Sequence, residues 1–104
     1  MKVFISQPMR DLDNDAILAK RAEITKALQA AYPDNTIEVI DSFFKDAPHE
    51  ARPLWFLGDS LKLMSEADLV VFADDWETAR GCKIEHECAL AYGYTILYIS
   101  DLIK

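Results

Sequence analysis

Short apolar runs alternate with longer segments of helical spacing along this chain. The runs are β-branched or apolar at consecutive positions, which is typical of strands in a parallel sheet. We therefore predict four strands, over residues 3–5, 36–40, 69–73 and 95–99. The run 69–73 is apolar on both faces, so it is expected to be a central, buried strand.

Apolar residues at intervals of three and four predict three helices between these strands. The first helix is expected to begin in the acidic segment 11–15, which suits the positive end of a helix dipole, and to reach about Tyr32. The other two are expected over residues 54–67 and 82–92. Gly93 is a typical C-terminal cap for the last one.

The order of elements indicates an α/β fold. Helices between successive strands require crossovers, so we predict one domain over residues 1–104 with a parallel sheet covered on both faces. The expected architecture is a flavodoxin-like or Rossmann-like three-layer sandwich with strand order 2-1-3-4. The loops 6–10 and 74–81 then meet at the switch point, where such folds bind ligands. The segment 42–53 has no clear period and is expected to be a loop, with or without a short helix.

Composition narrows the partners and the setting. A net charge of −7 argues against a nucleic acid polymer or an anionic membrane as the main partner, although a small anionic ligand needs only a few local cations. Cys82 and Cys88 lie about 9 Å apart along one predicted helix, too far for a disulfide. Reduced thiols, no signal peptide and no membrane span predict a soluble, cytoplasmic protein.

Glu85 is the strongest candidate for chemistry. Gly81, Glu85 and Ala89 are four residues apart and lie on one helical face, just after the loop that enters the predicted crevice. The alternative is an ordinary solvated glutamate that pairs with Arg80 or Lys83. Spacing alone does not decide between the two.

Three motifs, in order and across nearly the whole chain, carry a resemblance to a known family. They are Ile-Ser-Gln-Pro-Met at 5–9, Leu-Gly-Asp-Ser at 57–60 before Glu-Ala-Asp at 66–68, and Trp76 followed by Ala-Arg-Gly-Cys-Lys-Ile-Glu at 79–85. With these motifs the chain resembles the nucleoside 2-deoxyribosyltransferase superfamily, in particular its small phage and bacterial branch.

The resemblance implies a role for Glu85. In the relatives, a glutamate between a loop glycine and an alanine attacks the anomeric carbon of deoxyribose, releases the base and forms a covalent glycosyl-enzyme. A supporting aspartate lies early in the preceding helix, and Asp59 is the nearest match. Asp59 is one residue away from the expected place, which Ser60 occupies, so capping of the helix is its alternative role. Asp74 and Asp75 are further candidates for the second acid.

The resemblance also implies that the loop after the first strand binds the sugar or its 5′-phosphate. In this chain Gln-Pro-Met replaces the glycine-rich version of that loop. Arg10 and Arg80, with Arg52 as a third, are the natural partners of an anion, and ordinary surface positions are the alternative for them. Trp76, Phe43 and Trp55 could each stack on a base. For Phe43 and Trp55, packing in the core or between subunits is the alternative. The expected substrate-binding residues are Ser6, Gln7, Met9, Arg10, Asp75, Trp76, Arg80 and Gly81.

No metal or cofactor is expected. Cys82 and His86 are spaced to share a metal, but two further ligands are not evident. Arg21 lies on the apolar stripe of the first helix, and we expect it to reach the surface or to pair with an acid across a subunit contact. Neighbouring subunits complete the site in the relatives, so a homo-oligomer, a dimer or larger, is expected here.

The sequence therefore supports three functional hypotheses. The first is an N-glycosidase or deoxyribosyltransferase that acts at C1′ of a nucleoside or nucleotide. The second is a non-catalytic module that binds or sequesters a nucleotide. The third is a structural subunit, whose melting temperature would not respond to nucleotides.

Overall fold

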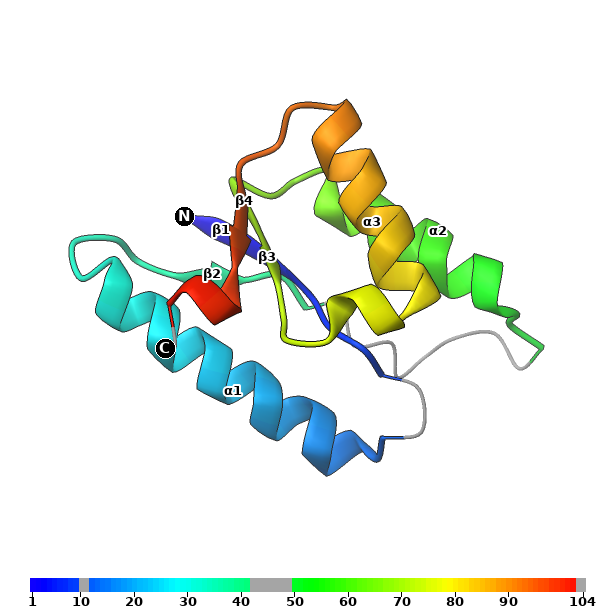
Figure 1. The fold of residues 1–104 in the computed structure, drawn as a ribbon, viewed down its shortest axis with the longest axis horizontal. Coiled ribbons are helices and arrows are strands. Elements are labelled where there is room, and N and C mark those ends of the chain that lie inside the picture. Colours follow the sequence, from blue (N-terminus) through cyan, green and yellow to red (C-terminus); the bar gives the residue numbers. More distant parts are fainter. Residues whose placement is uncertain (10–11, 42–49, 103–104) are drawn as a thin grey trace.

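A computed structural model describes residues 1–9, 12–41 and 50–102 of the chain. Within these residues it shows an α/β fold in which a four-stranded, all-parallel sheet is flanked by three helices (Figure 1). The strand order is β2-β1-β3-β4, which confirms the predicted order 2-1-3-4. The strands are β1 (Lys2–Ser6), β2 (Glu38–Val39), β3 (Leu69–Phe72) and β4 (Ile96–Tyr98).

The register of the sheet fixes where its carboxyl edge lies. β1 is central and pairs with both β2 and β3, and Ser6 at its end is the partner of Phe72 at the end of β3. The chain therefore leaves β1 and β3 side by side. This confirms that the loops after the first and third strands start from neighbouring positions, as a switch point requires.

The helices cover both faces of the sheet (Figure 1). α1 (Asn14–Ala31) lies on one face, whereas α2 (Pro53–Met64) and α3 (Arg80–Ala91) lie together on the other. Ile24 and Leu28 of α1 pack against one side of the strands, and Met64 and Ala89 pack against the opposite side. The sheet thus lies between two apolar cores, and β3 is apolar and buried on both faces as predicted.

Local signals in the sequence agree with the ends of two helices. The Asp13 side chain accepts a hydrogen bond of 2.7 Å from the backbone N–H of Ala16, so it caps α1 as an acidic N-terminus should. After α3, Gly93 has a φ of 74°, a conformation that a residue without Cβ adopts freely.

The structure differs from the predicted elements in three places. The last strand ends at Tyr98, because Ile99 begins a 3-10 turn, Ile99–Asp101. β2 pairs over only Glu38–Val39, because as an edge strand it has β1 alone as a neighbour. The predicted loop 74–81 contains a 3-10 turn, Trp76–Thr78, which begins after Asp75 with a φ of 64°. Of the predicted loop 42–53, residues 42–49 lie outside the described part of the chain.

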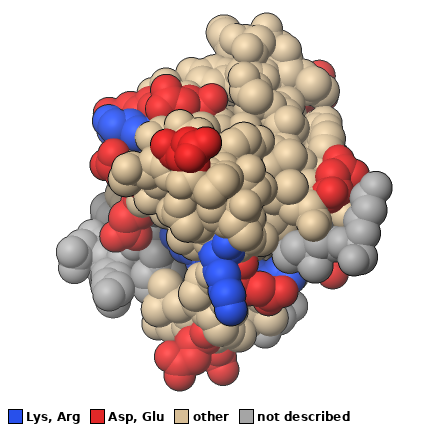
Figure 2. All heavy atoms as spheres, turned by 90° about the vertical axis from the view of Figure 1, so that its left-hand side faces the viewer, with Lys and Arg blue, Asp and Glu red and all other residues tan. Residues whose placement is uncertain are grey.

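Charge is spread over the visible surface. On the face in Figure 2, acidic side chains surround a mostly uncharged area, and the Lys and Arg side chains drawn there form no continuous basic patch. Among the described helices, none has the length and apolar character needed to cross a membrane.

Candidate functional site

An open cleft of about 1190 Å³ lies at the carboxyl end of β1. Its walls come from β1 and the loop after it, from one face of α2, and from the segment that leads into α3. The lining residues include Phe4, Ile5, Ser6, Gln7, Pro8, Met9, Pro53, Phe56, Leu57, Ser60, Thr78, Ala79, Arg80, Gly81, Cys82, Lys83 and Glu85. A hollow of this size can hold a nucleotide-sized molecule.

Glu85 is a buried carboxylate in the wall of this cleft. The residue is 6% exposed, and Oε1 accepts a hydrogen bond of 2.8 Å from the Ser6 hydroxyl. Cys82, Glu85 and Ala89 form the buried face of α3, so the helix presents the carboxylate to the end of β1. The alternative of a solvated glutamate is therefore wrong.

Burial changes the acidity of this group. Removal from water disfavours the charged form and raises the pKa of Glu85 from 4.5 to about 7, while the hydrogen bond from Ser6 lowers it in part. Burial therefore moves the titration of this carboxyl group from the acidic range toward neutral pH. A group with such a pKa can act as a nucleophile when ionised and can exchange a proton when neutral.

Cys82 lies next to this carboxylate in the same cleft. Burial raises the pKa of the Cys82 thiol to about 11, a hydrogen bond with Ser6 opposes the rise, and the Glu85 charge adds to it. The thiol is therefore neutral at pH 7 and is a poor nucleophile. Cys82 and Cys88 are both free, as their spacing predicts.

The residue after Ser6 connects the cleft to the opposite helix layer. Gln7 accepts a hydrogen bond of 2.9 Å from Nε of Arg21 and donates one of 3.2 Å to the backbone carbonyl of Ile17. The prediction that Arg21 reaches the surface is wrong, whereas its pairing with an acid of another subunit stays a prediction. Its side chain is buried within the chain because the Gln7 amide supplies a polar partner there.

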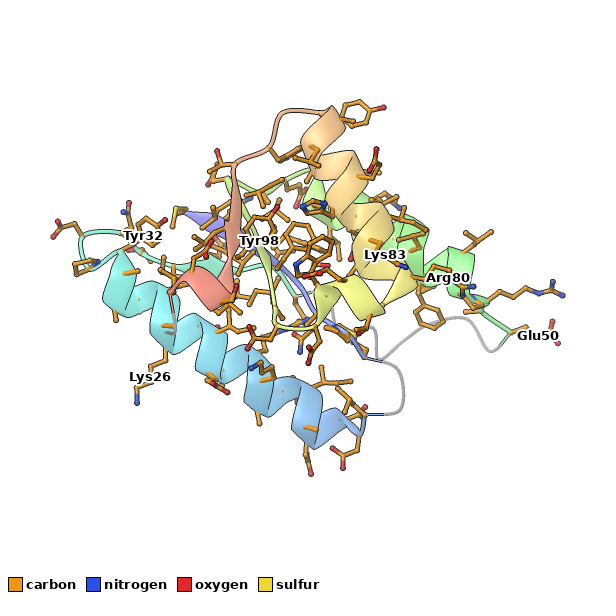
Figure 3. The ribbon with its side chains drawn as sticks, in the orientation of Figure 1. Lys26, Tyr32, Glu50, Arg80, Lys83 and Tyr98 are labelled. Carbon is orange, nitrogen blue, oxygen red and sulfur yellow. The ribbon has the colours of Figure 1, made fainter. Side chains whose placement is uncertain are left out.

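Two cations line the cleft where α3 begins. Arg80 and Lys83 lie in the first turns of that helix, and Figure 3 shows Arg80 toward the end of the molecule where α2 starts, with Lys83 further along α3. Ala79 caps the helix without a side-chain hydrogen bond, so the first backbone N–H groups of α3 have no side-chain cap. These features favour an anionic group in this part of the cleft.

The candidates for a second acid lie elsewhere. Asp59 is not among the described residues that line the cleft, and its carboxylate pairs with Lys62 at 3.6 Å. Ser60 lines the cleft in its place. Asp74 is exposed and pairs with Lys20 at 3.4 Å. Within the described lining residues, Glu85 is thus the only carboxylate.

Asp75 and Trp76 are also placed outside the lining of the cleft. The Trp76 ring stacks on His86 with centroids 4.2 Å apart and on Tyr98 at 5.9 Å. Nε2 of His86 and the Tyr98 hydroxyl are 2.6 Å apart, which ties this aromatic cluster together. Figure 3 shows Tyr98 on β4, away from Arg80, so the structure gives Trp76 a packing role beside α3.

Of the expected binding residues, the structure brings together Ser6, Gln7, Met9, Arg80 and Gly81 around Glu85. Arg10, which was expected to bind the substrate, and Phe43, which was considered for stacking on a base, lie outside the described residues.

Sequence reasoning missed the face of α2. Pro53, Phe56, Leu57 and Ser60 line the cleft at intervals of three and four, and this spacing was the available signal. Trp55 forms an edge-to-face pair with Phe56 at 5.2 Å, so its ring packs beside the lining.

No cluster of three or more His, Cys, Asp or Glu side chains suited to a metal occurs in the described residues. Comparisons of the chain with protein-family models, with curated proteins and with solved structures gave no match. The resemblance to nucleoside 2-deoxyribosyltransferases thus stays a prediction that rests on the motifs and the geometry of the cleft.

Proposed function

We propose that this protein acts at C1′ of a nucleoside or nucleotide as an N-glycosidase or 2-deoxyribosyltransferase, with Glu85 as the nucleophile. One observation carries the proposal. The Glu85 carboxylate is buried in the wall of a nucleotide-sized cleft and is held there by the Ser6 hydroxyl. Burial of a carboxyl group is costly, and a buried carboxyl group that faces a cleft is a candidate for a functional residue.

The reaction would proceed in two steps. An ionised Glu85 oxygen forms a bond to C1′ while the C1′–N bond breaks. The electron pair of the C1′–N bond leaves with the base, which takes up a proton from water. The carboxylate stabilises the oxocarbenium-like transition state and then the covalent glycosyl-enzyme. Water would release the free sugar, or a second base would take up the glycosyl group. Either step regenerates Glu85.

The surroundings of the carboxylate support a nucleotide as the substrate. Arg80 and Lys83 offer two positive charges to a 5′-phosphate, at the end of α3 where the helix dipole also favours an anion. Phe56 and Leu57 give the wall formed by α2 an apolar surface for a flat base. No cofactor enters this chemistry.

The proposal extends to the setting of the protein. Free cysteines suit a cytoplasmic location, where thiols stay reduced. Leu54 is 78% exposed near the start of α2 and gives the surface beside the cleft an apolar character. We infer that a second copy of the chain covers this apolar surface, so that the active form is a homo-oligomer.

Base release is the test of this function. We expect the wild type to release base from deoxynucleoside 5′-monophosphates, measured by chromatography. Glu85→Gln should lower kcat by at least about a thousandfold, because the nucleophile is lost. Glu87→Gln is the matched control, since Glu87 is an exposed glutamate on the same helix. Equal activity of wild type and Glu85→Gln would contradict the proposal.

One observation favours a second candidate, a nucleotide-binding module without turnover. Within the described lining residues, no second carboxylate stands ready to protonate the leaving base. Calorimetry with a nucleoside monophosphate, followed by chromatography of the ligand, separates the two candidates. Tight binding with unchanged ligand would support the module over the enzyme.

A further inference from the structure

The buried polar side chains in the described part of the chain form a single row. They are Ser6, Gln7, Arg21 and Glu85, with exposed fractions of 1%, 5%, 8% and 6%. Ser6 donates to Glu85, and Arg21 donates to Gln7. The two pairs meet because Ser6 and Gln7 are consecutive residues at the end of β1.

This row crosses the sheet from one helix layer to the other. Successive side chains of an extended segment point to opposite faces, so Ser6 contacts α3 whereas Gln7 contacts α1. Both hydrogen bonds of the Gln7 amide go to α1, one from Arg21 and one to Ile17. The amide is thereby fixed in orientation, and with it the start of the loop that continues into the cleft through Pro8 and Met9.

Arg21 occupies a buried position of α1 where an apolar residue would be expected if the position contributed only to stability. It belongs to the buried stripe of α1 with Ile17, Ile24 and Leu28. Burial lowers its pKa, and the charge of Asp41 opposes this effect. Desolvation of a guanidinium is costly, and buried polar or charged pairs can often be replaced by apolar residues of similar volume without loss of stability.

We propose that Arg21 is a positioning residue for the cleft, which acts through Gln7 to fix the end of β1 and so holds Ser6 against the Glu85 carboxylate. The activity readout of this inference rests on the proposed function. A second readout, the titration of Glu85, does not depend on turnover.

The test is the double variant Gln7→Met/Arg21→Met, which removes both members of the Arg21–Gln7 hydrogen bond. We expect its thermal midpoint to equal or exceed that of the wild type. We also expect kcat/KM for a deoxynucleoside monophosphate to fall at least tenfold. A purely structural role would instead lower the thermal midpoint.

Lys26→Met is the matched control. Lys26 lies on the same helix, and Figure 3 shows it pointing away from the sheet. This variant should leave the thermal midpoint and kcat/KM unchanged. Arg21→Lys keeps the charge but loses the guanidinium fork, so it should lower kcat/KM like the double variant.

The titration of Glu85 by carboxyl NMR gives the second readout. Looser contact with Ser6 weakens the hydrogen bond that favours the ionised form, so the double variant should titrate at a higher pH than the wild type. Unchanged titration, wild-type kcat/KM, or a double variant that is less stable or no longer folds would each overturn the inference. A wild type without turnover, combined with a raised titration midpoint in the double variant, would contradict the proposed function and still support the positioning role.

Discussion

A single carboxyl group, that of Glu85, connects the fold to the proposed chemistry. Its helix places it against the end of β1, where the Ser6 hydroxyl is its hydrogen-bond donor. An ordinary surface glutamate would be fully ionised at pH 7, whereas this one titrates near pH 7 because it is buried. The same burial that prepares the group for catalysis therefore reduces stability at neutral pH.

This conflict gives a prediction at the scale of one residue. A pKa raised from 4.5 to about 7 means that the folded protein holds a proton that the unfolded chain has lost, so the free energy of unfolding falls as pH rises through this window. The shift corresponds to about 3 kcal/mol. Glu85→Gln lacks this titration and should gain about that much stability relative to wild type between pH 4 and pH 8. Urea unfolding at both pH values measures it.

Glu87→Gln serves again as the control, and its stability relative to wild type should not change with pH in this way. If the free energies of unfolding of Glu85→Gln and wild type differed by the same amount at pH 4 and pH 8, burial would not raise the pKa of the Glu85 carboxyl group.

Helical spacing predicts which side chains share a face, but it does not predict their partners from other elements. The placement of Glu85 in the cleft was therefore predictable, and the burial of Arg21 was not. The four-residue spacing of Gly81, Glu85 and Ala89 fixes which face of the helix a side chain shares, and the small neighbours leave room for a carboxylate. At Arg21 the helical face was also correct. The partner was not predictable, because Gln7 comes from a different element and only the folded chain brings its amide to that position.

At the scale of elements, the start of α3 sets the electrostatics of the cleft. Its backbone N–H groups and the side chains of Arg80 and Lys83 offer positive charge to the same space. The net charge of the chain is −7, so this local field runs against that of the whole protein. An anionic ligand would therefore be recognised by these few groups.

The corresponding prediction concerns the substrate. Arg80→Gln/Lys83→Gln should raise KM for a deoxynucleoside 5′-monophosphate about tenfold or more, because charge-assisted hydrogen bonds to phosphate are lost. KM for the matching nucleoside, which lacks the phosphate, should change little. Steady-state kinetics with both substrates measures the effect.

Lys62→Gln is the control for loss of a cation, since Lys62 is exposed on α2 and pairs with Asp59. A rise in KM that is equal for the nucleotide and the nucleoside would show that Arg80 and Lys83 do not contact the phosphate.

The elements themselves were largely predictable. The apolar runs gave the strands, and the helical spacing gave the helices to within a few residues. β2 is shorter than its β-branched run suggests, because it pairs with β1 only over Glu38–Val39 at one edge of the sheet. The loop 74–81 was expected to bring Trp76 to the ligand, but the indole ring stacks on His86, an arrangement that depends on how β4 and α3 meet.

At the scale of the whole molecule, connectivity explains why the cleft lies where it does. Right-handed crossovers place α1 on one face of the sheet and α2 and α3 on the other (Figure 1). The end of β1 is then the place where residues adjacent in sequence touch both helix layers. The alternation of strands and helices predicts a parallel sheet, and the expected order 2-1-3-4 is confirmed. The position of the cleft was therefore predictable even though its α2 wall was not.

The central claim is that Glu85 forms a covalent bond to the sugar. The most direct measurement is mass spectrometry of the protein after acid quenching of its reaction with a deoxynucleoside 5′-monophosphate. We predict a deoxyribosyl phosphate adduct on the peptide that contains Glu85 in the wild type, and none in Glu85→Gln. Base release by the wild type with the adduct on another residue, or base release that persists in Glu85→Gln, would contradict the account.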